Sequence, residues 1–171
     1  LSRKTMNRLF VLLATVGICV AALLLGSTPA AAISRDVIIE RAQSWVDKVL
    51  YNQKAYYPDY PDGYRQDCSG YVGMAWMLTD SSGAPYSPNT SWLWDNTQSI
   101  VKDELLPGDI LLNRGSAYPH AVIFHKWANS AKSSYWAYEA WNPSGKANVD
   151  PVVYHEVPYR YYPGYDTAGY E

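Results

Sequence analysis

The sequence predicts an α+β domain, with helices in the first half of the chain and strands in the second. Residues 34–51 place Val, Ile, Trp and Leu side chains roughly along one stripe at helical spacing. Residues 120–127 (HAVIFHKW) form a β-branched and aromatic run with period-2 alternation, which is typical of a strand. Because helices and strands are segregated along the chain, we expect an antiparallel sheet packed on the helices.

A leader precedes the predicted domain. Three basic residues lie within the first eight positions, residues 9–26 are uncharged and mostly apolar, and an Ala-x-Ala pattern ends at Ala32. This order is typical of a Sec signal peptide. We therefore expect residues 1–32 to be removed and residues 33–171 to form a single secreted, extracellular domain. A retained membrane anchor is the alternative, since the apolar run approaches the length of a bilayer span.

Size and charge restrict the partners of this domain. About 139 residues are enough for one ordinary domain with its own core. The formal net charge of the whole chain is −2, and three of its cations lie in the leader, so the domain carries about −5. Nucleic-acid binding requires a basic surface and is not expected. We expect a monomer that, once the leader is cleaved, does not bind membranes.

The first half contains the helices. Ser34 is the expected N-cap of the first helix. The Pro-, Asp- and Tyr-rich residues 52–66 read as a loop. Residues 68–78 (CSGYVGMAWML) are long and apolar enough for a buried helix, and a short helical turn is expected around residues 92–100.

The second half contains the strands. A Pro-Gly turn in residues 104–113 introduces the first one, and residues 120–127, 134–141 and 151–157 are the others. Alternation places His120 on the same face as Val122 and Phe124, and Glu139 on the same face as Tyr135 and Ala137.

Cys68 is the candidate nucleophile. Cys19 lies inside the leader, so Cys68 is the one cysteine left in the predicted domain. An unpaired cysteine in an exported protein suggests a reactive thiol or an intermolecular bridge, although a buried inert thiol is the alternative. The start of a helix favours the thiolate. Ser69 and Gly70 are the expected substrate contacts, with Gly70 leaving space for a substrate backbone.

His120 and Glu139 are the candidates for a base and its orienting acid. If their strands pair, Glu139 can accept a hydrogen bond from the far ring nitrogen of His120, which fixes the tautomer.

Asp67 is expected to be a capping residue. His125 is expected to be structural and His155, next to Glu156, to be solvated. Cysteine and histidine spacing fits no zinc pattern, so we expect no metal or cofactor.

Three motifs carry a resemblance to a known family. DCSGYV, LLPGDILL and HAVIF, in this order, resemble the NlpC/P60 family of secreted cysteine peptidases. The resemblance covers most of the domain, from the first helix to Glu139. It implies a reduced papain-like fold and hydrolysis of amide bonds in peptidoglycan stem peptides of the cell wall, often at a D-γ-glutamyl-diamino acid link.

The resemblance also assigns roles. Cys68 matches the nucleophile and His120 the base. Glu139 is the best match for the third residue, where the family more often has His, Asn or Gln, and Asn142 is the rival. In the family a tyrosine hydroxyl lies by the oxyanion, and Tyr51 is the first candidate for it.

The choice of tyrosine, one further departure from the family pattern and two other functions stay open. Tyr56 and Tyr57 stand behind Tyr51 as candidates, and the Trp-Gly-Gly stretch that the family tends to have upstream of the cysteine is missing. A transglutaminase-like acyltransferase would use the same Cys-His pair. A secreted binding module with a decayed cleft would use neither residue catalytically.

Overall fold

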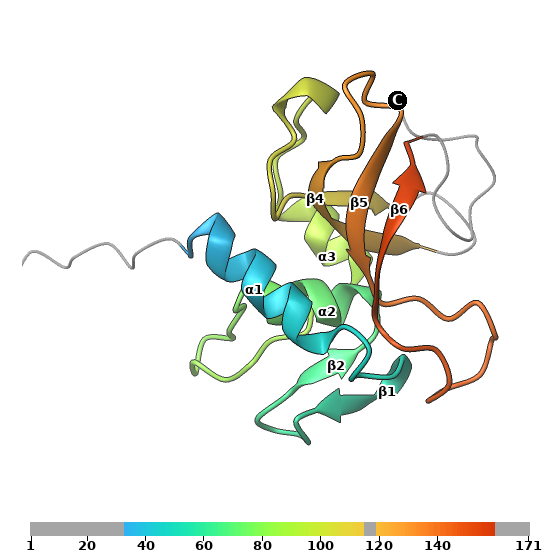
Figure 1. Ribbon diagram of the computed structural model, residues 1–171. Coiled ribbons are helices and arrows are strands. Elements are labelled where there is room, and N and C mark those ends of the chain that lie inside the picture. The colour runs from blue at the N-terminus through green and yellow to red at the C-terminus, as the bar shows by residue number, and fades with distance from the viewer. Residues whose placement is uncertain (1–32, 115–118, 160–171) are drawn as a thin grey trace, which may run out of the picture. The chain divides into compact units, whose positions relative to one another are not determined.

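The computed structural model describes residues 33–114 and 119–159, and the predicted leader lies outside them. The described residues belong to one unit. Its helices and antiparallel sheets confirm the α+β class (Figure 1). In chain order its elements are α1 (Arg35–Trp45), β1 (Asn52–Tyr57), β2 (Tyr64–Gln66), α2 (Cys68–Ala75), α3 (Thr90–Asp95), the 3-10 helix η1 (Lys102–Glu104), β3 (Ile110–Asn113), β4 (His120–Trp127), β5 (Ser134–Glu139) and β6 (Val153–Pro158). None of the described helices is both long and apolar enough to span a bilayer.

Two antiparallel sheets frame the helices. β3, β4, β5 and β6 form a four-stranded sheet in sequence order, and β1 pairs with β2 in a separate hairpin. In Figure 1, α1 and α2 lie to one side of the large sheet, and the hairpin lies beyond α2. β2 leads directly into α2, so the hairpin sets where that helix begins.

Strand β4 of the large sheet is buried on both faces over its first five residues. Ala121 and Ile123 join the core made with α1 and α2, whereas Val122 and Phe124 join a second cluster with Tyr135 of β5. A strand that packs on both sides reads as nearly continuous apolar sequence, which is what residues 120–124 show after the initial histidine.

The first helix is shorter than predicted. Ser34 caps it as expected, its side chain accepting a hydrogen bond from the Val37 amide at 3.3 Å. The helix ends at Trp45 because the next residues pair with the chain before β6: Val46 bridges to Val152, and Leu50 bridges to Pro151. Tertiary pairing here overrides a helical stripe of apolar residues.

The loop predicted over residues 52–66 is wrong. Most of this segment forms β1 and β2, in which Tyr57 pairs with Tyr64, and only the Pro- and Asp-rich centre is a turn. Smaller shifts affect other elements. α2 ends at Ala75, α3 begins at Thr90 under an Asn89 cap, and β5 ends at Glu139.

Candidate active site

Cys68 is the first residue of α2. Its N-cap, Asp67, accepts a hydrogen bond from the Gly70 amide at 2.8 Å, as the sequence predicts for a capping residue. The cysteine is a free thiol and 6% exposed. Its sulfur thus lies at a helix N-terminus, where unpaired amides and the helix dipole favour negative charge.

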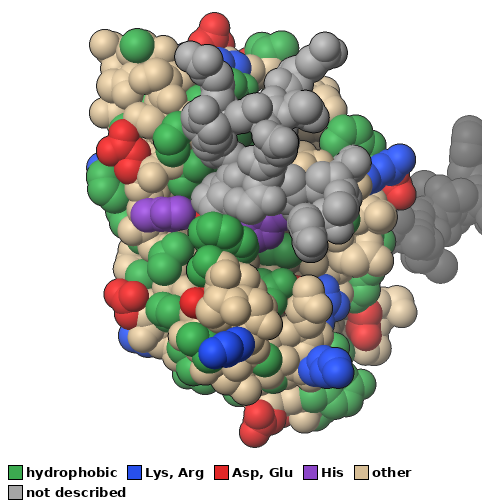
Figure 2. All heavy atoms as spheres, turned by 90° about the vertical axis from the view of Figure 1, so that its right-hand side faces the viewer, with side chains coloured by type: hydrophobic (Ala, Val, Ile, Leu, Met, Phe, Trp, Pro, Cys, Tyr) green, Lys and Arg blue, Asp and Glu red, His purple; other side chains and the backbone are tan. Residues whose placement is uncertain are grey.

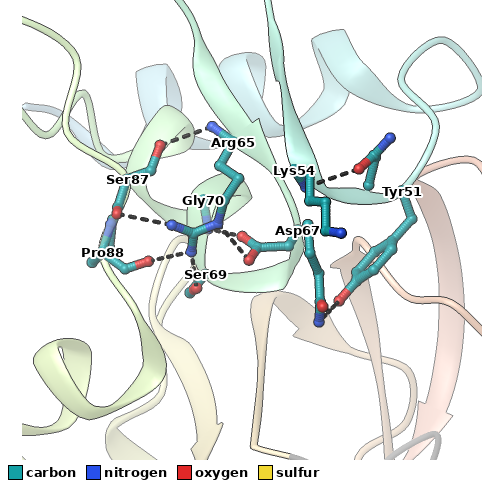
Figure 3. Close-up of polar contacts among 10 residues, drawn as sticks. Tyr51, Lys54, Arg65, Asp67, Ser69, Gly70, Ser87 and Pro88 are labelled. Atoms are coloured by element: carbon teal, nitrogen blue, oxygen red, sulfur yellow. Dashed lines mark hydrogen bonds and ion pairs between the residues drawn. The ribbon is translucent and has the colours of Figure 1, made fainter. Parts of the chain in front are cut away.

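Arg65 holds the turn before the cysteine. Its Nε lies 2.6 Å from Asp67 Oδ2, and its Nη2 donates to Ser69 Oγ at 3.1 Å. The same guanidinium donates to the Ser87 and Pro88 carbonyls at 3.3 and 2.8 Å (Figure 3). Arg65 therefore connects both sides of Cys68 to the loop before α3. Sequence analysis missed this residue, because its partners lie up to 23 positions away.

Ser69 and Gly70 are placed differently from the substrate contacts that we expected. Ser69 is buried, and its hydroxyl accepts from Arg65. A Cβ on Gly70 would lie 2.1 Å from the Arg65 carbonyl oxygen and 2.9 Å from Asp67 Oδ1. The space beside Gly70 is thus filled by the chain's own backbone. The glycine allows α2 to begin close against β2.

Gly70→Ala is expected to lower the free energy of unfolding by about 1–3 kcal/mol, because a backbone atom must move to admit the methyl group. Moving the first turn of α2 should also slow alkylation of Cys68. Urea denaturation and iodoacetamide kinetics measure the two effects. Gly83→Ala is the matched control. A Cβ there meets nothing within 4 Å, and only its positive φ of 86° costs stability, so Cys68 alkylation should not change.

His120 begins β4 and faces both Cys68 and Glu139. Its Nε2 lies 2.6 Å from Glu139 Oε1, and the ring is 5% exposed. Burial alone would lower the pKa of His120. The negative charge and hydrogen bond of Cys68, and then the hydrogen bond and charge of Glu139, outweigh burial and raise that pKa to about 9. Because Glu139 occupies Nε2, Nδ1 is the ring nitrogen that remains for the sulfur.

Glu139 is fully buried and lies between two imidazoles. Burial raises its pKa, but the hydrogen bonds and charges of His120 and His155 outweigh burial, and the net result is a lowered pKa. The rival, Asn142, lies beyond β5, and its side-chain oxygen accepts from Ser144 Oγ at 3.3 Å. Glu139 is therefore the residue at hydrogen-bonding distance from His120, as the sequence predicts.

The expectation that His155 is solvated is wrong. Its Nε2 lies 2.6 Å from Glu139 Oε2, and its side chain is 35% exposed. The adjacent Glu156 suggested a solvated segment, but alternation in β6 turns the two side chains to opposite faces. His125 is structural as expected: its Nδ1 lies 2.7 Å from the Tyr154 hydroxyl.

Tyr51 is the tyrosine of the three candidates that lies beside the cysteine. It is 8% exposed, and its hydroxyl accepts from Gln53 Nε2 at 3.1 Å (Figure 3). Burial, followed by the charge of Cys68, raises the pKa of Tyr51 to about 12, so its hydroxyl keeps a proton to donate. Tyr56 and Tyr57 point elsewhere, with their rings against Tyr60 and Trp45.

Two other findings concern binding sites in the described residues. No group of three or more His, Cys, Asp or Glu side chains there is arranged to hold a metal ion. A pocket of about 460 Å³ lies between α3, η1 and β3, and its lining includes neither Cys68 nor His120. This pocket is therefore distinct from the Cys68 site.

Compared with protein-family models, curated proteins and solved structures, the chain gives no match to any of them.

Proposed function

We propose that this protein is a secreted cysteine hydrolase that cleaves amide bonds in peptidoglycan stem peptides through a thioester on Cys68. One observation carries the catalytic part of the proposal. A cysteine at a helix N-terminus is hydrogen-bonded to a buried histidine, whose Nε2 lies 2.6 Å from a buried carboxylate. Nucleophile, base and orienting acid in this geometry are the requirements of thiol catalysis.

The proposed reaction begins with His120 protonated, because its pKa of about 9 lies above neutral pH. In the proposed mechanism Cys68 is the thiolate, the form that a helix N-terminus and a neighbouring imidazolium favour. The Cys68 thiolate attacks the carbonyl carbon and forms a tetrahedral oxyanion. His120 gives its proton to the amine, the C–N bond breaks, and a thioester remains. Neutral His120 then takes a proton from water, the hydroxide attacks the thioester, and the carboxylate product leaves as the thiolate re-forms.

Two donors are proposed for the oxyanion. They are the backbone N–H of Cys68, at the open end of α2, and the hydroxyl of Tyr51. Each donor of this type lowers the barrier by about 3 kcal/mol. Tyr51 suits the role because its raised pKa keeps it neutral beside the thiolate.

The substrate class and the reduced papain-like arrangement rest on the resemblance to the NlpC/P60 family, and export rests on the signal-peptide pattern of residues 1–32. The first motif contains Cys68, the second contains the turn before β3, and the third contains His120. The second and third motifs pair with each other as β3 and β4, with Leu112 opposite Ala121.

The test is incubation of the purified protein with a stem tetrapeptide, followed by mass spectrometry. Two new fragments, one with a new amine and one with a new carboxylate, support hydrolysis. Addition of methylamine separates the acyltransferase alternative, which would give a methylamide in place of the free acid. Binding of intact peptide with no product would contradict the proposal and favour the non-catalytic binding module.

We expect kcat/KM to fall on the alkaline side with an apparent pKa of about 9, because above it His120 has no proton for the leaving amine. An unperturbed histidine would place this limb at about 6.5. Initial rates across about pH 6 to 10 measure it, and the value belongs to the coupled Cys68–His120 pair. His125→Gln should leave the limb in place. A limb near 6.5 would show that the thiolate and Glu139 do not hold the proton on His120.

A further inference from the structure

The proposed mechanism uses one of the two imidazoles that hold Glu139. His120 binds Oε1 and His155 binds Oε2, each at 2.6 Å. The two histidines come from different strands, β4 and β6, on either side of the strand that carries the acid. The second imidazole is therefore a part of the site whose role remains to be assigned.

The register of the sheet explains this arrangement. Ala137 of β5 lies opposite His155, so Glu139, two residues along, is its diagonal neighbour. Tyr138 lies opposite Ile123 of β4, which makes His120 the diagonal neighbour of Glu139 on the other side. Diagonal positions share a face and lie about 7–8 Å apart at the backbone, within reach of long side chains.

A buried carboxylate needs partners for both of its oxygens. Glu139 is fully buried, and an unmatched oxygen there would carry the cost of desolvation. With one partner only, the carboxylate could also rotate about its terminal bond. Two partners on opposite sides define its plane, and with it the direction of the bond to His120.

His155 also connects this interior group to the surface. His120 and Glu139 have side chains 7% and 0% exposed, whereas the His155 side chain is 35% exposed. Figure 2 shows histidine side chains at the surface of the face that it views. A substitution at His155 is thus less disruptive to packing than one at the two buried residues, which makes it a suitable probe.

We propose that His155 is a positioning residue: by donating to Glu139 Oε2 it holds the carboxylate ionised and oriented toward His120, and so sets the reactivity of Cys68. Its consequence for turnover rests on the proposed hydrolase function. Its consequence for the Cys68–His120 pair does not, because thiol reactivity and histidine titration can be measured without a substrate.

The experiment compares three variants of the whole protein. His155→Leu removes the donor and keeps bulk, His155→Gln keeps an amide donor near the position of Nε2, and His125→Leu is the matched control. His125 is a half-buried histidine of β4 that also bonds one partner, the Tyr154 hydroxyl. The measurements are iodoacetamide alkylation of Cys68 at about pH 7, where thiol and thiolate forms are distinguished, NMR titration of His120, and kcat and KM on the stem peptide.

We expect His155→Leu to slow alkylation and lower kcat by about 10-fold or more, as for other residues that orient a directly acting ligand. The pKa of His120 should fall from about 9, and KM should change little. His155→Gln should restore most of the alkylation rate, and His125→Leu should resemble the wild type.

A folded His155→Leu protein with wild-type alkylation and His120 titration would overturn the proposal. If His155→Leu does not fold, His155→Asn gives the same test, because its shorter amide stays polar but does not reach Glu139. A wild-type protein that cleaves no stem peptide would overturn the proposed function alone. The role of His155 would then still stand or fall on the titration of His120 and the alkylation of Cys68.

Discussion

Cys68→Ala is expected to abolish hydrolysis of stem peptides, with a loss on the order of 10⁵-fold or more. Without the sulfur no thioester can form. His120 and the oxyanion donors can then only polarise the amide. The loss should appear in kcat, because the peptide-binding surface of the site is otherwise unchanged. Mass spectrometry of the wild-type protein after incubation with the peptide should detect a covalent adduct that the variant lacks.

The same substitution has an effect that does not depend on any substrate. The charge and hydrogen bond of Cys68 are what chiefly oppose burial in raising the pKa of His120. In Cys68→Ala that pKa should therefore fall from about 9, and NMR titration of the ring measures the fall. Thermal unfolding serves as the control, because loss of one sulfur atom should leave α2 capped by Asp67. An unchanged His120 titration would contradict the ion pair at the start of the mechanism.

The faces of β4 and β5 on which His120 and Glu139 lie could be predicted from local sequence, because they depend on period 2. Alternation fixed which residues of β4 share a face with His120, and the faces found in the two core clusters agree for Ala121 and Val122. Their mutual distance followed once the two strands were assumed to be neighbours. The helix start at Cys68 was equally local, since Asp67 is a strong capping residue.

The parts that sequence could not predict depend on contacts between distant segments. His155 reaches Glu139 only because β5 and β6 pair in one particular register, across a connection of 13 residues between 139 and 153. Arg65 reaches Pro88 only after β2 and the loop before α3 meet. The hairpin of β1 and β2 was read as a loop because its prolines and aspartates, which mark the turn, dominate its composition.

Glu139→Gln is expected to lower kcat by about 10³–10⁴-fold while preserving shape. The amide has one acceptor and one donor group, and it faces two imidazoles. If its oxygen faces His120, the imidazolium loses the negative charge that stabilised it. If its NH₂ faces His120, Nε2 must accept, the ring proton moves to Nδ1, and the nitrogen toward Cys68 can no longer take a proton.

Either orientation lowers the pKa of His120. The lower kcat should therefore be accompanied by a shift of the alkaline limb of kcat/KM to lower pH. Glu156→Gln is the matched control: it is the same substitution on an exposed position of β6, where the carboxylate bonds Ser134 Oγ. Its kinetics should equal those of wild type. A wild-type kcat in Glu139→Gln would show that Glu139 does not orient His120. The orienting role would then pass to Asn142, and Asn142→Ala should lower kcat.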